Sequence, residues 1–193
     1  GSQDIITIQQ STNTDNTALE IYNKKNLFGV KDKSGNIVIQ PKYNKLIRLG
    51  TSAWISEEKH KFGIISNSGA TIIPAKYRHA ERFLGKYVKL GNETAYGLYD
   101  ETGKSIIPPE YSFIDIISFD KFIVCKNYKY GIINTNGETV IPNAFDDIYI
   151  SKIDGVNLKY KAEWYRLATE ESVPVFLNKK TIETLDLKDM QFT

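Results

Sequence analysis

The chain has 193 residues, of which 41% are hydrophobic and 25% are charged. This length is enough for one domain or two small ones with a real core. The composition is that of a globular protein, not of a disordered chain, a collagen or a coiled coil. With 25 basic and 23 acidic side chains, the net charge is +2. Because the basic residues are also scattered along the chain, we expect no nucleic-acid partner, which would need a concentrated basic face.

The scarce residue types exclude several chemistries. Cys125 is the only cysteine, so we expect no intramolecular disulfide and no cysteine-based metal cluster. The two histidines, His60 and His79, are too few for a three-histidine zinc site. No window reaches the roughly 18–20 apolar residues of a membrane-spanning helix. We therefore expect no metal, no cofactor and no membrane span.

The first residues bear on location. Gly1-Ser2 is typical of an expression-tag remnant. The polar start that follows is compatible with a chain cut behind a signal peptide, and also with a domain excised from a longer chain. The first of these readings favours a periplasmic or cell-surface location.

Taken in chain order, the first expected strand covers residues 18–22, and four units with a period of 34 residues follow it. Each unit begins with an aromatic residue and a glycine: Phe28-Gly29, Phe62-Gly63, Tyr96-Gly97 and Tyr130-Gly131. Three more columns keep the period, namely a second glycine (Gly35, Gly69, Gly103, Gly137), an isoleucine (Ile39, Ile73, Ile107, Ile141) and a second aromatic (Tyr43, Tyr77, Tyr111, Phe145). Because they recur, we expect the isoleucines and the first aromatics to be almost fully buried.

Each unit is expected to contain short antiparallel strands. The aromatic-Gly segment alternates as a strand does, and an Asp, Asn or Ser three residues before the second glycine predicts a type I turn with positive φ at that glycine. A β-branched strand follows and is expected to stop at Pro74, Pro108 or Pro142, where an N–H is missing. A less regular stretch and one more strand complete a unit of three or four strands.

The last unit is degenerate. Trp164-Tyr165 follows Tyr130-Gly131 by 34 residues, but its glycines are lost, and residues 186–190 could form one helical turn. We expect a single structural domain with an N-terminal partial repeat at residues 1–25, four repeats at residues 26–159, and a degenerate fifth repeat and cap at residues 160–193. The predicted fold is all-β, an open twisted array of 34-residue antiparallel β-meander repeats. The alternative is a closed, propeller-like ring of five units, completed by the N-terminal strand.

These columns resemble the bacterial WG repeat family, also called KWG repeats. The family pattern is roughly aromatic-Gly-Leu/Ile-Ile-Asp-x-x-Gly-x-x-Val-Ile-Pro-x-x-Tyr-Asp. The closest match runs from Tyr130-Gly131-Ile132-Ile133 through Gly137 and Val140-Ile141-Pro142 to Phe145-Asp146. The resemblance covers residues 26–150 strongly and 161–177 weakly. It implies a structural or interaction module, and it brings no catalytic residues with it.

No residue pattern indicates catalysis, so we expect no enzyme. Cys125 lies in a strand pattern, which predicts a buried, inert thiol. His60 and His79 fit solvated loops. The acidic residues Asp115, Asp146, Asp147 and Asp154 lack the spacing of a calcium loop.

Recognition is expected to use the positions that differ between units. The segments after the second aromatic column vary most, and they change from basic to acidic along the chain: residues 44–51, 78–85, 112–120 and 146–154. Arg48, Arg78 and Arg82 would form the basic end. Tyr99 and Tyr165 alternate out of the repeat columns and would be exposed, whereas Trp54 fits an apolar column.

Two binding functions fit this pattern. The leading hypothesis is a non-catalytic module that binds or scaffolds another protein. The alternative is binding of a carbohydrate or cell-envelope polymer through exposed aromatic residues.

Overall fold

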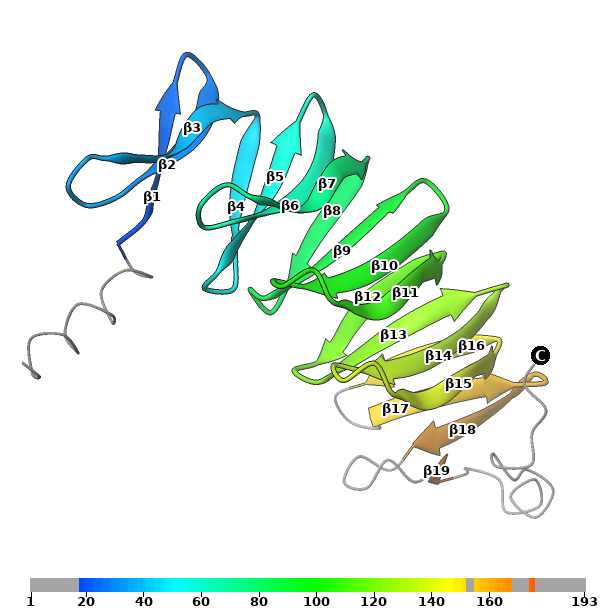
Figure 1. Ribbon diagram of the computed structural model, residues 1–193. Coiled ribbons are helices and arrows are strands. Elements are labelled where there is room, and N and C mark those ends of the chain that lie inside the picture. The colour runs from blue at the N-terminus through cyan, green and yellow to red at the C-terminus, as the bar shows by residue number, and fades with distance from the viewer. Residues whose placement is uncertain (1–17, 152–154, 168–173, 176–193) are drawn as a thin grey trace, which may run out of the picture. The chain divides into compact units, whose positions relative to one another are not determined.

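The computed structural model describes residues 18–151, 155–167 and 174–175, and these residues form strands and turns without a helix. The strands make five antiparallel sheets (Figure 1). The first sheet has the order β1-β2-β3 and contains β1 (Glu20–Lys24), β2 (Leu27–Lys31) and β3 (Ile37–Tyr43). The second contains β4 (Lys45–Leu49), β5 (Ala53–Glu58), β6 (Lys61–Ser66) and β7 (Thr71–Tyr77).

The remaining three sheets also have four strands each, paired in sequence order. The third contains β8 (His79–Phe83), β9 (Tyr87–Asn92), β10 (Ala95–Asp100) and β11 (Ser105–Tyr111). The fourth contains β12 (Phe113–Ser118), β13 (Lys121–Lys126), β14 (Lys129–Asn134) and β15 (Thr139–Phe145). The fifth contains β16 (Asp147–Ser151), β17 (Gly155–Tyr160), β18 (Glu163–Leu167) and β19 (Pro174–Val175).

Strand pairing in the described residues is open. The N-terminal strand β1 pairs with β2, and the last sheet is made of β16 to β19 alone. Among the described strands, none from one end of the chain completes a sheet at the other, as the ring alternative requires. The fold is therefore an all-β tandem array of small antiparallel sheets. The possible turn at residues 186–190 lies outside the described residues.

The variable segments contain strands, so the expectation of a less regular stretch there was wrong. They contain β4, β8, β12 and β16, each of which is the first strand of a four-stranded sheet. Each places apolar side chains in a core, such as Leu49 in β4 and Ile114 in β12. Charged residues between these positions obscure the alternation in the sequence. The open choice between three and four strands per unit is thus resolved as four.

The second glycine column closes a tight turn in every unit, as predicted. Gly35, Gly69, Gly103 and Gly137 have φ between 80° and 87°. The glycine N–H donates to the carbonyl oxygen three residues earlier, for example Gly35 to Asp32 at 3.0 Å. This left-handed conformation costs glycine little, because it has no Cβ.

A second kind of turn was not predicted. The hairpins β1–β2, β5–β6, β13–β14 and β17–β18 turn through two residues that both have positive φ: Lys25-Asn26, Lys59-His60, Asn127-Tyr128 and Lys161-Ala162. This is the geometry of a type I′ turn, whose usual sequence signal is Asn-Gly or Asp-Gly. Because these turns contain no glycine, the sequence carried almost no signal for them. They place bulky side chains at the tip of each hairpin.

The first glycine column lies where two backbones approach closely. A Cβ on Gly63 would lie 2.3 Å from the carbonyl oxygen of Ile73, and Gly29, Gly97 and Gly131 face the following strand in the same way. Phe62 pairs with Tyr77 and Ile64 with Ile73, so Gly63 faces the three residues 74–76. The strand therefore bulges at its proline and continues. The prediction that it stops at Pro74, Pro108 and Pro142 was wrong, because proline is compatible with a bulge on an edge strand.

The contacts divide the chain into two compact units, the first with residues 1–93 and 98–105 and the second with residues 94–97 and 106–193. Within the first, two cores form around Val30, Ile39 and Trp54, and around Leu49, Ile64 and Leu90. Within the second, a core forms around Ile132, Ile141 and Phe145.

The repeat columns contribute unequally to these cores. Ile39, Ile107 and Ile141 are buried as predicted, whereas Ile73 is only half-buried. The first aromatic column is also half-buried, so its predicted near-complete burial was wrong: Phe28, Phe62, Tyr96 and Tyr130. These rings lie next to the hairpin ends of their sheets, where solvent reaches one edge.

We predict that Gly63→Ala lowers the free energy of unfolding by about 3 kcal/mol or more, because its Cβ would meet rigid backbone. Gly35→Ala is the matched control. It has φ +86° but nothing within 4 Å of its Cβ position. It should lose only the about 1–2 kcal/mol of a left-handed residue. Urea unfolding of both variants measures the difference, and equal losses would contradict the close approach.

Candidate binding surfaces

Arg48, one of the predicted partner-binding residues, is part of the protein's internal structure. Its guanidinium carbon lies 4.4 Å from the ring centre of Trp54, which is buried as its apolar column predicts. The guanidinium also donates to the side-chain oxygen of Asn67 and to the carbonyl oxygens of Thr51 and Ala53. Partial burial lowers the pKa of Arg48, and the charge of Glu101 opposes this shift. Arg48 therefore holds the β4–β5 turn.

The other two predicted arginines also have partners within the chain. Arg82 donates from Nη1 to the carbonyl oxygen of Arg48 at 2.8 Å, so the structure brings these two together. Arg78 lies at the other end of β8 and forms an exposed ion pair of 2.8 Å with Glu93. Partner binding by these arginines stays a prediction. Charge reversal at Arg48 or Arg82 would also break internal contacts, so neither is a clean test position.

Glu101 joins the second and third sheets. It lies in the β10–β11 turn, and its Oε2 accepts hydrogen bonds from the backbone N–H of Thr51 at 2.8 Å and of Ser52 at 2.7 Å. The Ser52 hydroxyl donates to the same oxygen at 2.6 Å. Partial burial raises the pKa of Glu101, but these three hydrogen bonds outweigh it and hold the pKa below its usual value.

Tyr99 and Tyr165 do not lie on the surface, so their predicted exposure was wrong. Tyr99 is 8% exposed and Tyr165 is 2% exposed. Burial and a hydrogen bond with Tyr77 raise the pKa of Tyr99. Alternation out of a repeat column leads to solvent only when one face of a sheet is open. Tyr99 instead packs against a core that includes Leu49 and Val88.

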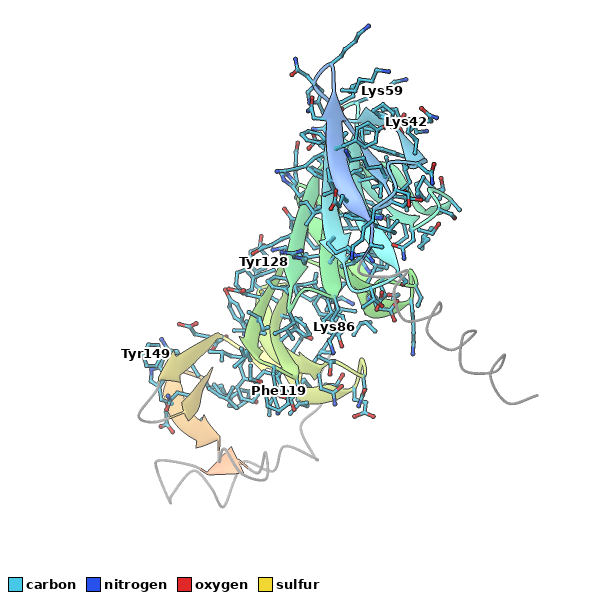
Figure 2. The ribbon with its side chains drawn as sticks, turned by 90° about the vertical axis from the view of Figure 1, so that its left-hand side faces the viewer. Lys42, Lys59, Lys86, Phe119, Tyr128 and Tyr149 are labelled. Atoms are coloured by element: carbon cyan, nitrogen blue, oxygen red, sulfur yellow. The ribbon has the colours of Figure 1, made fainter. Side chains whose placement is uncertain are left out.

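The exposed aromatic residues are different ones, and the sequence did not single them out. Tyr128 is 93% exposed, Phe119 80% and Tyr149 60%. Tyr128 is at the tip of the β13–β14 hairpin, Phe119 is in the β12–β13 turn, and Tyr149 lies in the middle of β16. Phe119 and Tyr128 thus lie at opposite ends of β13, and Figure 2 shows them well separated. These rings do not form one continuous platform.

The described residues considered for catalysis or metal binding do not form one cluster. The thiol of Cys125 is buried in β13, and His60 and His79 are exposed. Asp146 pairs with Lys129, while Asp115 and Asp147 each accept the backbone N–H of the next residue. Asp154 lies outside the described residues. Among the residues that are described, no three metal-ligating side chains gather, and no helix is long and apolar enough to cross a membrane.

Five exposed lysines lie at one end of the second sheet and at the β3–β4 junction beside it, and we call them the lysine end: Lys42, Lys45, Lys59, Lys61 and Lys76. They come from the end of β3, the start of β4, the β5–β6 hairpin and β7. The backbone N–H of Lys59 donates to the side-chain oxygen of Asn44 at 3.0 Å, which ties the hairpin to the segment between Lys42 and Lys45. Figure 2 shows Lys42 and Lys59 near each other at this end.

The lysine end differs from the equivalent positions in the second compact unit. There, Lys126 pairs with Glu110 at 2.8 Å, and Lys129 pairs with Asp146. Glu110 occupies the same repeat position as Lys42 and Lys76, 68 residues after the first and 34 after the second. None of the five lysines forms an ion pair with another described residue. The lysine end therefore keeps its positive charge. In the second compact unit, acidic residues pair with the lysines instead.

Comparisons with known proteins agree with the repeat pattern. The sequence profile of the WG containing repeat matches residues 28–48, 96–130 and 130–152. No curated protein sequence matches the chain.

Among solved structures, Hsv2 of Kluyveromyces lactis is similar at 9% identity and a TM-score of 0.38, over 82% of this chain and 58% of its own. A eukaryotic initiation factor is similar at 13% identity and a TM-score of 0.39, over 84% and 53% of the two chains. A Bacteroides caccae protein of unknown function is similar at 13% identity and a TM-score of 0.30, over 84% and 73%. The chain spans less than two thirds of the first two proteins.

We predict that Glu101→Gln lowers the free energy of unfolding by about 1 kcal/mol at neutral pH, because charged acceptors make the stronger hydrogen bonds. The pKa of Glu101 is lowered by folding, so its contribution is complete above the unfolded value of 4.5 and is lost as the pH falls through the folded value. The difference between variant and parent should shrink in that range. Glu20→Gln, at an exposed position in β1, is the control. A pH-independent difference in the urea midpoint would contradict this role.

Proposed function

Because the chain belongs to the WG repeat family, we propose that it is a non-catalytic module that binds another protein. The proposal rests on one observation: the positions that recur in every repeat build the sheets, whereas the exposed positions vary between repeats. Glycines of the repeat columns close turns or admit a neighbouring backbone, and isoleucines such as Ile107 fill a core. The exposed residues at the sheet ends differ from repeat to repeat. Such a scaffold presents variable side chains without disturbing its core.

The chemistry of the surface supports a protein partner over a small substrate. Catalysis needs a nucleophile or base within hydrogen-bond reach of a second group. In the described part of the chain the one thiol is buried, and the two histidines belong to exposed positions on different strands and turns. In the described part of the chain, the lysine end presents five exposed side chains of the same charge.

A carbohydrate or cell-envelope polymer is the second candidate ligand. Its support is the exposure of Tyr128, Phe119 and Tyr149, because aromatic faces offer large contact areas at low entropic cost. Their separation along β13 and β16 weakens it, since sugar-binding rings need to be aligned over neighbouring sugar units. We therefore place protein binding first.

Two experiments distinguish these candidates. Selection from a displayed library of random peptides tests protein binding, and a glycan array tests carbohydrate binding. We expect the chain to enrich related peptides whose synthetic versions bind in the micromolar range by calorimetry. The matched control is Gly63→Ala, which keeps every exposed side chain but disturbs the sheet, and should lose this binding. Glycans bound tightly without any enriched peptide would overturn protein binding in favour of the second candidate.

A further inference from the structure

We propose that the lysine end is the contact surface for an acidic segment of the partner protein. This inference rests on the proposed function and specifies its partner. It starts from the five exposed ammonium groups of the lysine end, which three separate parts of the chain bring to the end of the second sheet and to the β3–β4 junction beside it. In the sequence these lysines are spread over 35 residues and look scattered. Only strand pairing gathers them.

Strand register sets the arrangement of charge at this end. Lys45 pairs with Glu57 across β4 and β5, and Lys61 pairs with Glu58 across β5 and β6. These two lysines have a carboxylate opposite them, although no ion pair forms. Lys42, Lys59 and Lys76 have no acidic residue opposite them in the sheet register. They are the groups with most to gain from an external carboxylate.

Two of these three lysines are held near aromatic rings. The ammonium of Lys42 lies 5.2 Å from the ring centre of Tyr43, and that of Lys76 lies 5.3 Å from the ring centre of Tyr77. Each ring is in the second aromatic column and ends its strand. A ring below the ammonium restricts a side chain that would otherwise lose much rotamer entropy on binding. The two lysines occupy equivalent positions one repeat apart, which gives a ligand two anchors related by the repeat.

The field around this end has the same sign. The described residues of the first compact unit, 18–93 and 98–105, contain fifteen lysines and arginines against eight acidic residues. Those of the second unit contain six against seven. A positive unit attracts an acidic partner over several ångströms and speeds its association at low ionic strength.

The local chemistry favours a peptide over a regular polyanion. Glu57 and Glu58 lie between the lysines, so a phosphate or uronate chain with a charge on every unit would meet like charges there. A peptide can space its carboxylates and place neutral residues against the glutamates. The lysine end also lacks arginine, whose planar fork suits bidentate phosphate binding. An extended acidic peptide therefore fits best.

The test compares two triple variants of the full chain. The first is Lys42→Glu with Lys59→Glu and Lys76→Glu. The control reverses three exposed lysines of the same compact unit in turns at the other ends of their sheets: Lys33, Lys86 and Lys104. Both carry the same change in net charge. Lys86 also lies over a ring, that of Tyr87, so the control includes a lysine with the same ring contact as Lys42 and Lys76.

The probe is a fluorescent peptide of about 12 residues alternating glutamate and serine, which spans roughly 40 Å when extended. Fluorescence anisotropy measures its Kd at low salt. We expect about a tenfold or greater loss of affinity in the lysine-end variant, against less than about threefold in the control. Equal losses in the two variants would mean a general charge effect and would overturn the proposal. If circular dichroism shows the reversed variant to be unfolded, the three Lys→Gln changes replace it, with a loss again expected.

Competing ligands separate the partner classes. Polyphosphate, polygalacturonate and single-stranded DNA are titrated against the bound peptide at equal charge. Tighter binding of any of these through the same lysines would overturn the assignment to an acidic peptide. Failure here is distinguishable from failure of the proposed function. Library peptides that bind equally well to the lysine-end variant would refute this surface and leave protein binding intact.

Discussion

The close approach of two backbones at the first glycine of each repeat is the constraint on which the other features depend. Where Gly63 faces the Ile73 carbonyl, no side chain fits, and the last strand of the sheet must bulge over it. The bulge accommodates proline without leaving an N–H unpaired in the ladder. It also brings the next aromatic, Tyr77, opposite Phe62, and the chain passes at once into β8. The glycine of the aromatic-Gly pair and the proline of the following strand therefore belong to the same backbone contact, although they are far apart in the repeat.

This constraint separates the positions that build the sheets from those that can vary. Within the first compact unit, one arginine side chain and one glutamate side chain make contacts that hold the structure together. Arg48 stacks on Trp54, and Glu101 collects three donors from the β4–β5 turn. The lysines of the lysine end form no ion pair with another described residue, although Lys42 and Lys76 lie over neighbouring rings. Guanidinium groups suit fixed internal networks because their donors have a rigid geometry, whereas ammonium groups on flexible stems remain available to a ligand.

The candidate binding surface could be predicted only in part from the sequence. The sequence directed attention to residues that differ between repeats, and among the residues it favoured, Arg48, Tyr99 and Tyr165 contact the protein itself. Alternation along a strand shows which residues share a face, but it does not show whether that face is covered. The exposure of Tyr128 was not predicted, because a type I′ turn without glycine has no strong sequence signal. The lysine end was not predicted, because its five lysines are far apart in the sequence.

By itself the sequence determined the repeat, its 34-residue period, the all-β class, the family, and the left-handed turn glycines such as Gly103. These features are local, since each depends on residues a few positions apart and recurs four times. The tertiary structure alone decided that the variable segments contain strands, that β7 continues past Pro74, and that five separated lysines lie at the end of the second sheet and the adjoining β3–β4 junction. Each of these outcomes depends on which backbones pair and in what register. Pairing joins residues far apart in the chain, so no pattern along the sequence records it.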